Sequence, residues 1–222
     1  MESWTLKRVQ GDDGACAQFE TSMLLVIDSA TAACSTALFD ADERLLDARH
    51  EVVGRGHAER LMPMIANLLD GRRPDAILVD CGPGSFTGLR VGLAAAHGLA
   101  IGWGVPLAGY SSMALLAAAS GAAEVVVALQ GGHGEIFVQN YAGDPVVPLD
   151  ALRSLGPEAA AASVAAALVV GSGAEALVTA RGWGEWRDAL PRAADALHLP
   201  AVLRQLPPRP IYGRAPDAKP MA

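Results

Sequence analysis

Clustered positive charge is scarce in this sequence. Arg72-Arg73 is the only adjacent basic pair after Lys7-Arg8, and 17 basic against 24 acidic residues give a formal net charge of −7. Because phosphate contacts need gathered Lys and Arg side chains, the chain is poorly suited to hold nucleic acid over an extended basic surface of its own. If RNA is involved, we expect a partner to hold it.

Paired cysteines and long apolar runs are also missing. Cys16, Cys34 and Cys81 are odd in number, lie far apart and form no CxxC pair, which favours reduced thiols in a cytosolic protein over disulfides or a zinc site. The longest apolar candidate, 91–105, is interrupted by glycines and His97, and falls short of the roughly 18 residues of a membrane span. We therefore expect a cytoplasmic protein without a membrane segment.

The sequence does contain enough apolar material for a folded core. Its 222 residues are 51% hydrophobic and 18% charged, which excludes disorder over most of the length. Residues 1–22 lack the apolar core of a signal peptide and differ in pattern from the residues after Met23. We interpret 1–22 as a flexible extension, with Met23 a possible natural start.

Hydrophobic periodicity predicts an α/β protein. Strands are expected at 23–28, 29–40, 44–52, 75–80, 105–109, 124–129, 136–141 and 167–170, and helices at 57–70, from the 82–90 turn to about 103, at 111–119, after Pro157 and at 195–205. Three antiparallel strands followed by helix, strand, helix and strand is the order of the actin-like, or ribonuclease H-like, fold.

The predicted organisation has two lobes, the second one reduced. The first lobe is assigned to 23–125 and the smaller second lobe to 126–206. The tail 207–222 is rich in proline, which predicts an extended segment running along a surface.

The most distinctive local feature is the glycine-hinged turn 82–90, which joins a buried strand to a helix. Backbone amides at such a helix start can bind an anion, so Gly84 and Ser85 are candidates for an anion site. The spacing nevertheless fails GxGxxG, the P-loop and GxSxG. The favoured alternative is that the glycines allow close packing while Ser85 or Thr87 caps the helix.

The helix after this turn is apolar nearly all round and carries small residues at four-residue spacing. Such a helix must be covered on more than one side, by the 57–70 helix, by the second lobe or by another chain. We therefore expect a partner interface, and its candidate residues come from both helices. They are His57, Leu61, Met64, Gly88, Leu89, Gly92, Ala95 and Ala96.

Five segments resemble one family, named TsaB, in order along the chain. They are 27–35 (IDSATAACS), 57–63 (HAERLMP), 82–92 (GPGSFTGLRVG), 134–137 (GEIF) and 211–217 (IYGRAPD). GPGSFTGLRVG is the most specific of them. The C-terminal third resembles the family mainly through the last segment.

The resemblance implies an actin-like fold and an accessory role in making N6-threonylcarbamoyladenosine at position 37 of tRNA. It implies pairing with a catalytic subunit of similar fold, TsaD, through the helices that follow the first strands, and association with an ATPase subunit, TsaE. The tRNA would be reached through the complex, and free copies could self-pair. ATP and metal are expected in the partner subunits.

The chain departs from catalytic relatives in ways that bear on chemistry. The five histidines include no i, i+4 pair, so we expect no metal site in this chain. With the catalytic motif spacings also unmatched, we expect no catalytic residue and no cofactor bound by this chain alone. Where many relatives have Asp-Ala-Arg-x-Gly-Glu, this sequence has Gln130 to Glu135, without the Asp and Arg. A small actin-like ATPase or metal-dependent peptidase acting alone is the alternative function, and an autonomous RNA-binding module is a third.

Overall fold

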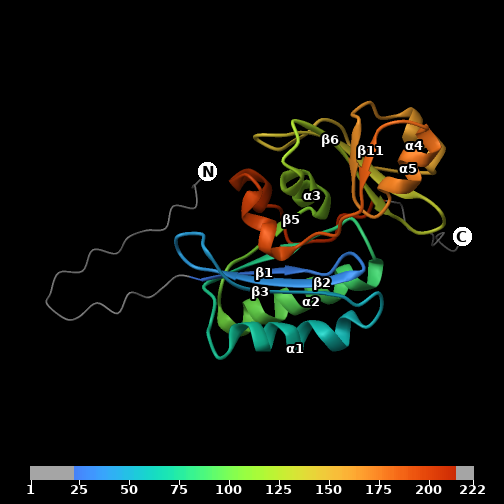
Figure 1. Ribbon diagram of the computed structural model, residues 1–222. Helices are drawn as coiled ribbons and strands as arrows, with labels where there is room; N and C mark the ends of the chain where they lie inside the picture. Colours follow the sequence, from blue (N-terminus) through green and yellow to red (C-terminus); the bar gives the residue numbers. More distant parts are fainter. Residues whose placement is uncertain (1–22, 214–222) are drawn as a thin grey trace, which may run out of the picture.

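Two mixed β-sheets form the framework of the chain, and they lie one above the other in Figure 1. The structure is a computed structural model that describes residues 23–213. The predicted extension 1–22 and the tail beyond Gly213, including most of the 211–217 segment, lie outside the described residues.

The first sheet has the order β3-β2-β1-β4-β5. Its strands are β1 (Leu24–Asp28), β2 (Ala33–Phe39), β3 (Leu45–Val52), β4 (Ala76–Asp80) and β5 (Leu107–Tyr110). β1, β2 and β3 pair antiparallel, whereas β4 runs parallel to β1 and β5 parallel to β4. The predicted element order of the first lobe is confirmed.

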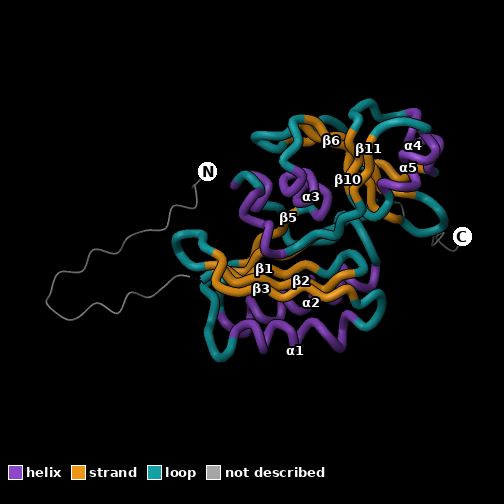
Figure 2. Tube along the Cα trace, viewed as in Figure 1, coloured by secondary structure: helices purple, strands orange, loops and turns teal. Residues whose placement is uncertain are grey.

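Two helices, α1 (His57–Leu69) and α2 (Phe86–Trp103), cover one face of this sheet (Figure 2). The apolar residues of α1 recur at helical spacing, so that Leu61, Ile65 and Leu68 are all buried against the sheet. α1 ends at Asp70, which is left-handed with φ 45°, and Gly71 follows with φ 79°. The last helical residue, Leu69, lies within one residue of the predicted end at 70.

The second sheet has the order β11-β10-β6-β7-β8, and a further strand, β9, also pairs with β7. Its strands are β6 (Glu124–Gln130), β7 (Ile136–Ala142), β8 (Val147–Pro148), β9 (Arg153–Leu155), β10 (Leu168–Val170) and β11 (Glu185–Arg187). Two short helices, α4 (Pro157–Ala162) and α5 (Ala174–Arg181), pack on one of its faces through Ala160, Ala174 and Leu177.

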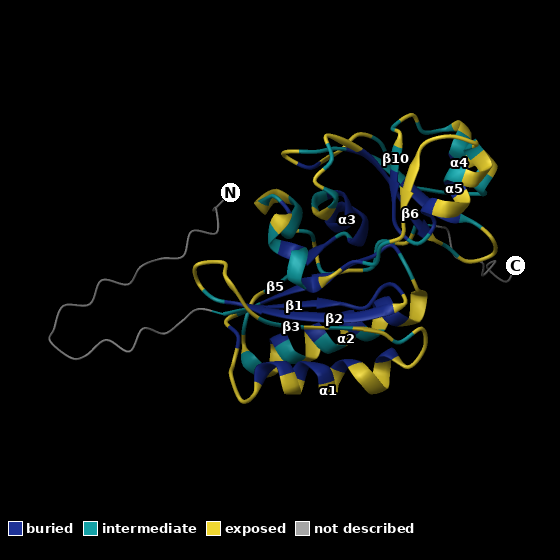
Figure 3. Cartoon of the chain, viewed as in Figure 1, coloured by how far each residue is buried: buried dark blue, intermediate teal, exposed yellow. Residues whose placement is uncertain are grey.

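The layer between the sheets is filled by α3 (Ser112–Ser120) and the 3-10 turn η1 (Ala193–His198). One cluster of buried residues joins Val26 and Leu78 of the first sheet to Met113 and Leu115 of α3 and Val127 of the second. Figure 3 shows β1 and β2 buried along their length between this layer and α1 and α2. The two lobes therefore share a core.

The predictions are weakest after Pro145. The helix predicted at 195–205 is instead two 3-10 segments, η1 and η2 (Ala201–Arg204), because Pro200 lies between them and cannot continue a helix. β8, β9, α5 and β11 were not predicted. Three of these are strands of two or three residues, too short to show a period.

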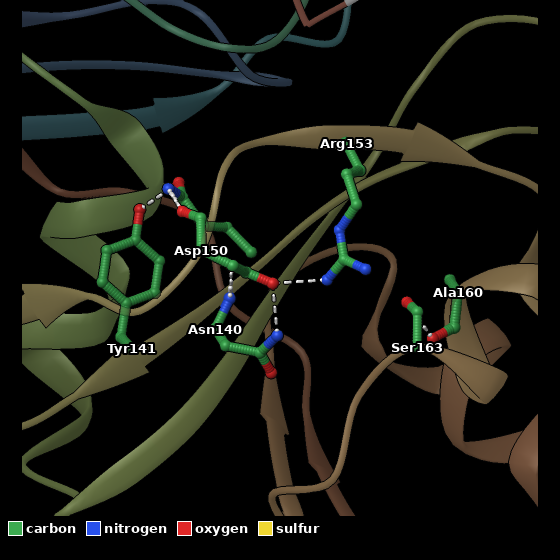
Figure 4. Close-up of polar contacts among 7 residues, drawn as sticks. Asn140, Tyr141, Asp150, Arg153, Ala160 and Ser163 are labelled. Carbon is green, nitrogen blue, oxygen red and sulfur yellow. Dashed lines mark hydrogen bonds and ion pairs between the residues drawn. The ribbon is translucent and has the colours of Figure 1, made fainter.

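A polar cluster fixes the segment between β8 and β9 to β7 (Figure 4). Asp150 accepts hydrogen bonds from the backbone N and Nδ2 of Asn140, at 2.9 and 2.7 Å, and from the Arg153 guanidinium at 2.5 Å. Tyr141 donates to Gln139 at 2.7 Å. The cluster holds this four-residue connection, 149–152, against β7 of the second sheet.

Candidate functional site

A cleft of about 810 Å³ opens between the two lobes. One wall is the β1–β2 turn at 30–32 together with Gly84 to Phe86, and the opposite wall is the 130–133 turn after β6. Leu129, Phe137 and Leu190 supply apolar surface. Its size is that of a small-molecule pocket. Among its described lining residues there is one Arg, one His and no acidic side chain.

The glycine-hinged turn reaches this cleft at the start of α2. Ser85 is the N-cap: its Oγ accepts a hydrogen bond from the backbone N of Gly88 at 3.3 Å. Its own backbone N donates to the carbonyl of Ala30 at 2.5 Å. The favoured interpretation of Ser85 as a cap is thus confirmed. Anion binding at Gly84 and Ser85 stays a prediction.

The glycines of the turn and of α2 are packing positions against the β1–β2 turn. A Cβ on Gly84 would collide with the Ala30 carbonyl, and one on Gly88 with the Ser29 carbonyl. One on Gly92 would collide with the Ser29 hydroxyl. That hydroxyl donates to the Gly88 carbonyl at 2.9 Å. The regular glycine spacing therefore lets α2 lie directly on the turn after β1.

His57 completes the same packed unit from α1. Its side chain is 5% exposed, and its Nε2 lies 2.8 Å from the carbonyl oxygen of Thr31. The ring also lies against Gly88, where a Cβ would come within 3.3 Å of it. Segments 27–35, 57–63 and 82–92, which carry the family resemblance, therefore meet at one place and fix one wall of the cleft.

This packing changes which side chains α1 and α2 can offer to another chain. Seven of the eight predicted interface residues are buried within the chain itself, and Ala95 is half-buried. The buried ones are His57, Leu61, Met64, Gly88, Leu89, Gly92 and Ala96. Direct contact with a partner through these seven residues is not supported, because the first sheet, its turns and the neighbouring helix already cover them.

The exposed face of α1 and α2 is formed by other residues, which lie next to the buried ones along each helix. On α2 it includes Arg90, Ala94, His97, Gly98 and Ile101, which recur every three or four residues. Ile101 is 82% exposed. α1 adds Met62, at 45%. Ile101 lies in the last turn of α2, and the sequence did not single it out as exposed. Spacing alone does not show which side of an apolar helix faces the sheet.

An aromatic cluster stands where this face meets the cleft. The guanidinium of Arg90 stacks 3.5 Å from the centre of the Phe86 ring and lies 3.4 Å from the hydroxyl of Tyr212. Both rings are about half exposed, at 54% and 50%. Farther along α2, His97 contacts the Pro208 carbonyl at 3.0 Å. The described part of the C-terminal segment therefore lies against α2, and its extended course over 207–222 stays a prediction.

Two buried carboxyls lie side by side at the ends of β1 and β4. The parallel register pairs Ile27 with Val79, so Asp28 is the neighbour of Asp80. Asp28 accepts a hydrogen bond from the Tyr110 hydroxyl at 2.8 Å, and Asp80 from Ser112 Oγ at 2.7 Å. Burial and the neighbouring Asp80 raise the pKa of Asp28, and burial raises the pKa of Asp80 to about 6.

The 130–135 turn keeps Glu135, whose carboxylate accepts a hydrogen bond from Ser154 at 2.6 Å.

Across residues 23–213, no three His, Cys, Asp or Glu side chains are grouped as metal ligands would be. In the same range, no helix combines the length and apolar character needed to cross a bilayer.

Comparison with known proteins agrees with this architecture. Residues 50–176 match the family model described as "TsaD: tRNA N6-adenosine threonylcarbamoyltransferase". A solved structure from Pseudomonas aeruginosa, described as similar to peptidase YeaZ, superposes with a TM-score of 0.75 at 30% identity, covering 87% of this chain and all of that one. A protein of Escherichia coli named tRNA threonylcarbamoyladenosine biosynthesis protein TsaB is 35% identical over 130 residues.

The chain belongs to the TsaB family. The match to the Escherichia coli TsaB covers 54% of this chain and about half, 55%, of that relative's length. An uncharacterized protein of Mycobacterium tuberculosis is 32% identical over 91% of this chain and 97% of its own length. The predicted actin-like, two-lobed fold is confirmed. The transferase named by the family model and the peptidase named by the Pseudomonas aeruginosa structure describe other proteins. Neither name identifies a reaction of this chain.

Proposed function

We propose that this TsaB-family chain takes part in tRNA threonylcarbamoyladenosine biosynthesis as a non-catalytic partner of a TsaD-type catalytic subunit. The family assignment supports the pathway. The observation that carries the partner role is the exposed face of α1 and α2, where Met62 and Ile101 stand in solvent. A TsaE-type ATPase would join the complex, which would act on tRNA in the cytoplasm, with ATP and metal held by the partners.

The shape of this face favours a second pair of helices as its contact. Nothing lies within 4 Å of the Cβ positions of Gly98 and Gly102 on α2, so another helix could approach the backbone closely there. Burying exposed apolar surface at about 25 cal/mol per Å² supports association, against the loss of translational and rotational freedom. Free copies of the chain could use the same face to pair with each other.

Co-purification with a TsaD-type subunit tests this proposal. Ile101→Glu places a charge on the expected contact face and should reduce recovery of the complex at least tenfold. Val202→Glu is the matched control, because Val202 is 73% exposed on η2, away from the α1 and α2 face. Both variants should retain the melting temperature of the native chain, since neither side chain is part of the core. Equal recovery of the complex for both variants would count against the proposed face.

The non-catalytic part of the proposal has a separate test. The purified chain should not transfer a threonylcarbamoyl group to tRNA unless the catalytic subunit is added, and calorimetry should detect no tight binding of ATP or zinc. Transfer by the chain alone would overturn the accessory role while leaving the pathway intact. Salt-sensitive binding of tRNA without partners would instead favour the RNA-binding alternative.

A further inference from the structure

β3 is the outer strand of the first sheet and has a partner, β2, on one side. The backbone N of Val53 donates to the Ala32 carbonyl at 2.9 Å, so in the antiparallel ladder the odd-numbered residues of β3 turn their backbone groups toward β2. Ala48, His50 and Val52 therefore turn theirs outward. An outward row of this kind is a template for another strand.

The centre of this edge is closed by its own side chains. The backbone N of Ala48 donates to Asp47 Oδ1 at 2.8 Å, and the Ala48 carbonyl accepts from the Arg49 guanidinium at 2.8 Å. Asp47 and Arg49 also form an ion pair with each other. These two side chains thus occupy the outward hydrogen-bonding groups at the middle of the strand.

The charges of the edge are complementary to themselves. If a second β3 lies antiparallel with its Ala48 opposite Ala48, Asp47 of each strand faces Arg49 of the other. The outward groups of Ala48 then form a hydrogen-bonded pair, and the 47–49 positions form the closer, non-hydrogen-bonded pairs in which cross-strand side chains interact. Asp47 and Arg49, which pair with each other within one strand, can therefore each pair with the other strand instead, forming two ion pairs between the strands.

We propose that the β3 edge pairs with the β3 edge of a second copy of this chain, about a two-fold axis at Ala48. The two first sheets become one continuous sheet, and the Asp47–Arg49 pair switches from within the strand to between strands. Because the hydrogen bonds at Ala48 and the ion pairs replace ones already present, they add little to the free energy of association, and the pairing is weak and reversible. Exposed apolar side chains at Leu46 and Val52, at 45% and 69%, add contact area.

This surface is distinct from the proposed partner face. β3 is the edge of the sheet, whereas α1 and α2 lie on its face, so a chain could bind a catalytic subunit and a second copy together. The two associations are separable by experiment. Ile101→Glu should leave edge pairing unchanged.

Disulfide trapping tests the geometry, with Cys16→Ser as the background for both variants. Ala48→Cys should form a cross-linked dimer, because Cα atoms of a hydrogen-bonded antiparallel pair are about 5.5 Å apart, within reach of a disulfide. Val52→Cys is the control: the two copies of residue 52 would be about 27 Å apart, at 3.4 Å per residue. Cys34 and Cys81 are buried and should not react. Equal cross-linking of the two variants would overturn the proposed register.

Charge reversal tests the ion pairs without a cysteine. Asp47→Arg puts two arginines opposite each other at both pairs and should weaken self-association about tenfold in sedimentation experiments. The double variant Asp47→Arg/Arg49→Asp restores opposite charges between strands and should restore association. If the double variant is as weak as the single one, or the single one associates as the native chain does, the edge pairing is refuted.

Discussion

Replacing Asp80 with asparagine should stabilise the protein at neutral pH. The Asp80 carboxyl is 2% exposed, and its Oδ1 accepts from the backbone N of Gly82 at 2.8 Å and from Ser112 Oγ at 2.7 Å. An asparagine carbonyl oxygen can keep both hydrogen bonds. Within the described residues, Asp80 Oδ2 and Asp28 Oδ1 have no hydrogen-bond partner. The asparagine NH₂ takes the position of that Oδ2, next to the Asp28 carboxyl, whose Oδ1 lacks a donor.

The magnitude follows from the raised pKa of Asp80. Burial raises it from 3.8 to about 6, so the folded protein binds the proton more tightly than the unfolded chain does. Below about pH 4 the group is protonated in both states and costs nothing. As pH rises through 6, the free energy of unfolding falls by about 3 kcal/mol, at 1.36 kcal/mol per pKa unit, and it stays lower by that amount at higher pH. Asparagine removes this dependence.

Urea unfolding at a series of pH values measures the effect. The free energy of unfolding of Asp80→Asn should exceed that of the native chain by about 3 kcal/mol at pH 7, and the two should converge near pH 4. Asp42→Asn is a control, because Asp42 is a solvent-exposed carboxylate paired with Arg44 in the β2–β3 turn. A variant that is less stable than the native chain at pH 7, or equally stabilised at pH 4 and pH 7, would refute the argument.

Further predictions concern the packed unit behind the cleft. Gly88→Ala should lower the free energy of unfolding by about 1–3 kcal/mol, because its methyl group meets the Ser29 carbonyl. Gly98→Ala, on the open side of the same helix, should raise it by up to about 1 kcal/mol. Urea unfolding that gave both variants the same sign would contradict this assignment. His57→Ala should cost about 1–3 kcal/mol by leaving the Thr31 carbonyl unpaired, and amide exchange at Ala32 should rise with it.

Periodicity predicted most of the first lobe because each of its elements is long enough to show a pattern. The apolar spacing of α1 and the continuous apolar run of β4 each point to one type of element. In the second lobe, α5 has eight residues and β11 three. Their identity depends on pairing with β10 and packing on β6, which are contacts between residues distant in the sequence.

The predicted partner interface illustrates what residue spacing leaves open. Gly88 and Gly92 lie on one side of α2, and a row of small residues is equally suited to packing within the chain or between chains. The position of Ser29 directly beneath them shows that this row packs within the chain. Because Gly88 and Gly92 face the first sheet, Gly98 and Ile101 lie on the side of α2 that faces away from it.

The sequence by itself determined the family, the fold class and the segments that meet at the cleft wall, because these depend on local patterns and on motifs read in order. Tertiary structure alone decided which face of α2 is open, that Asp28 and Asp80 are neighbours, and that β3 is an edge. These depend on strand order and register, which bring together residues such as Asp28 and Tyr110, 82 positions apart. The burial of Asp28 and Asp80 and the interaction between their charges arise only because the fold brings these residues together.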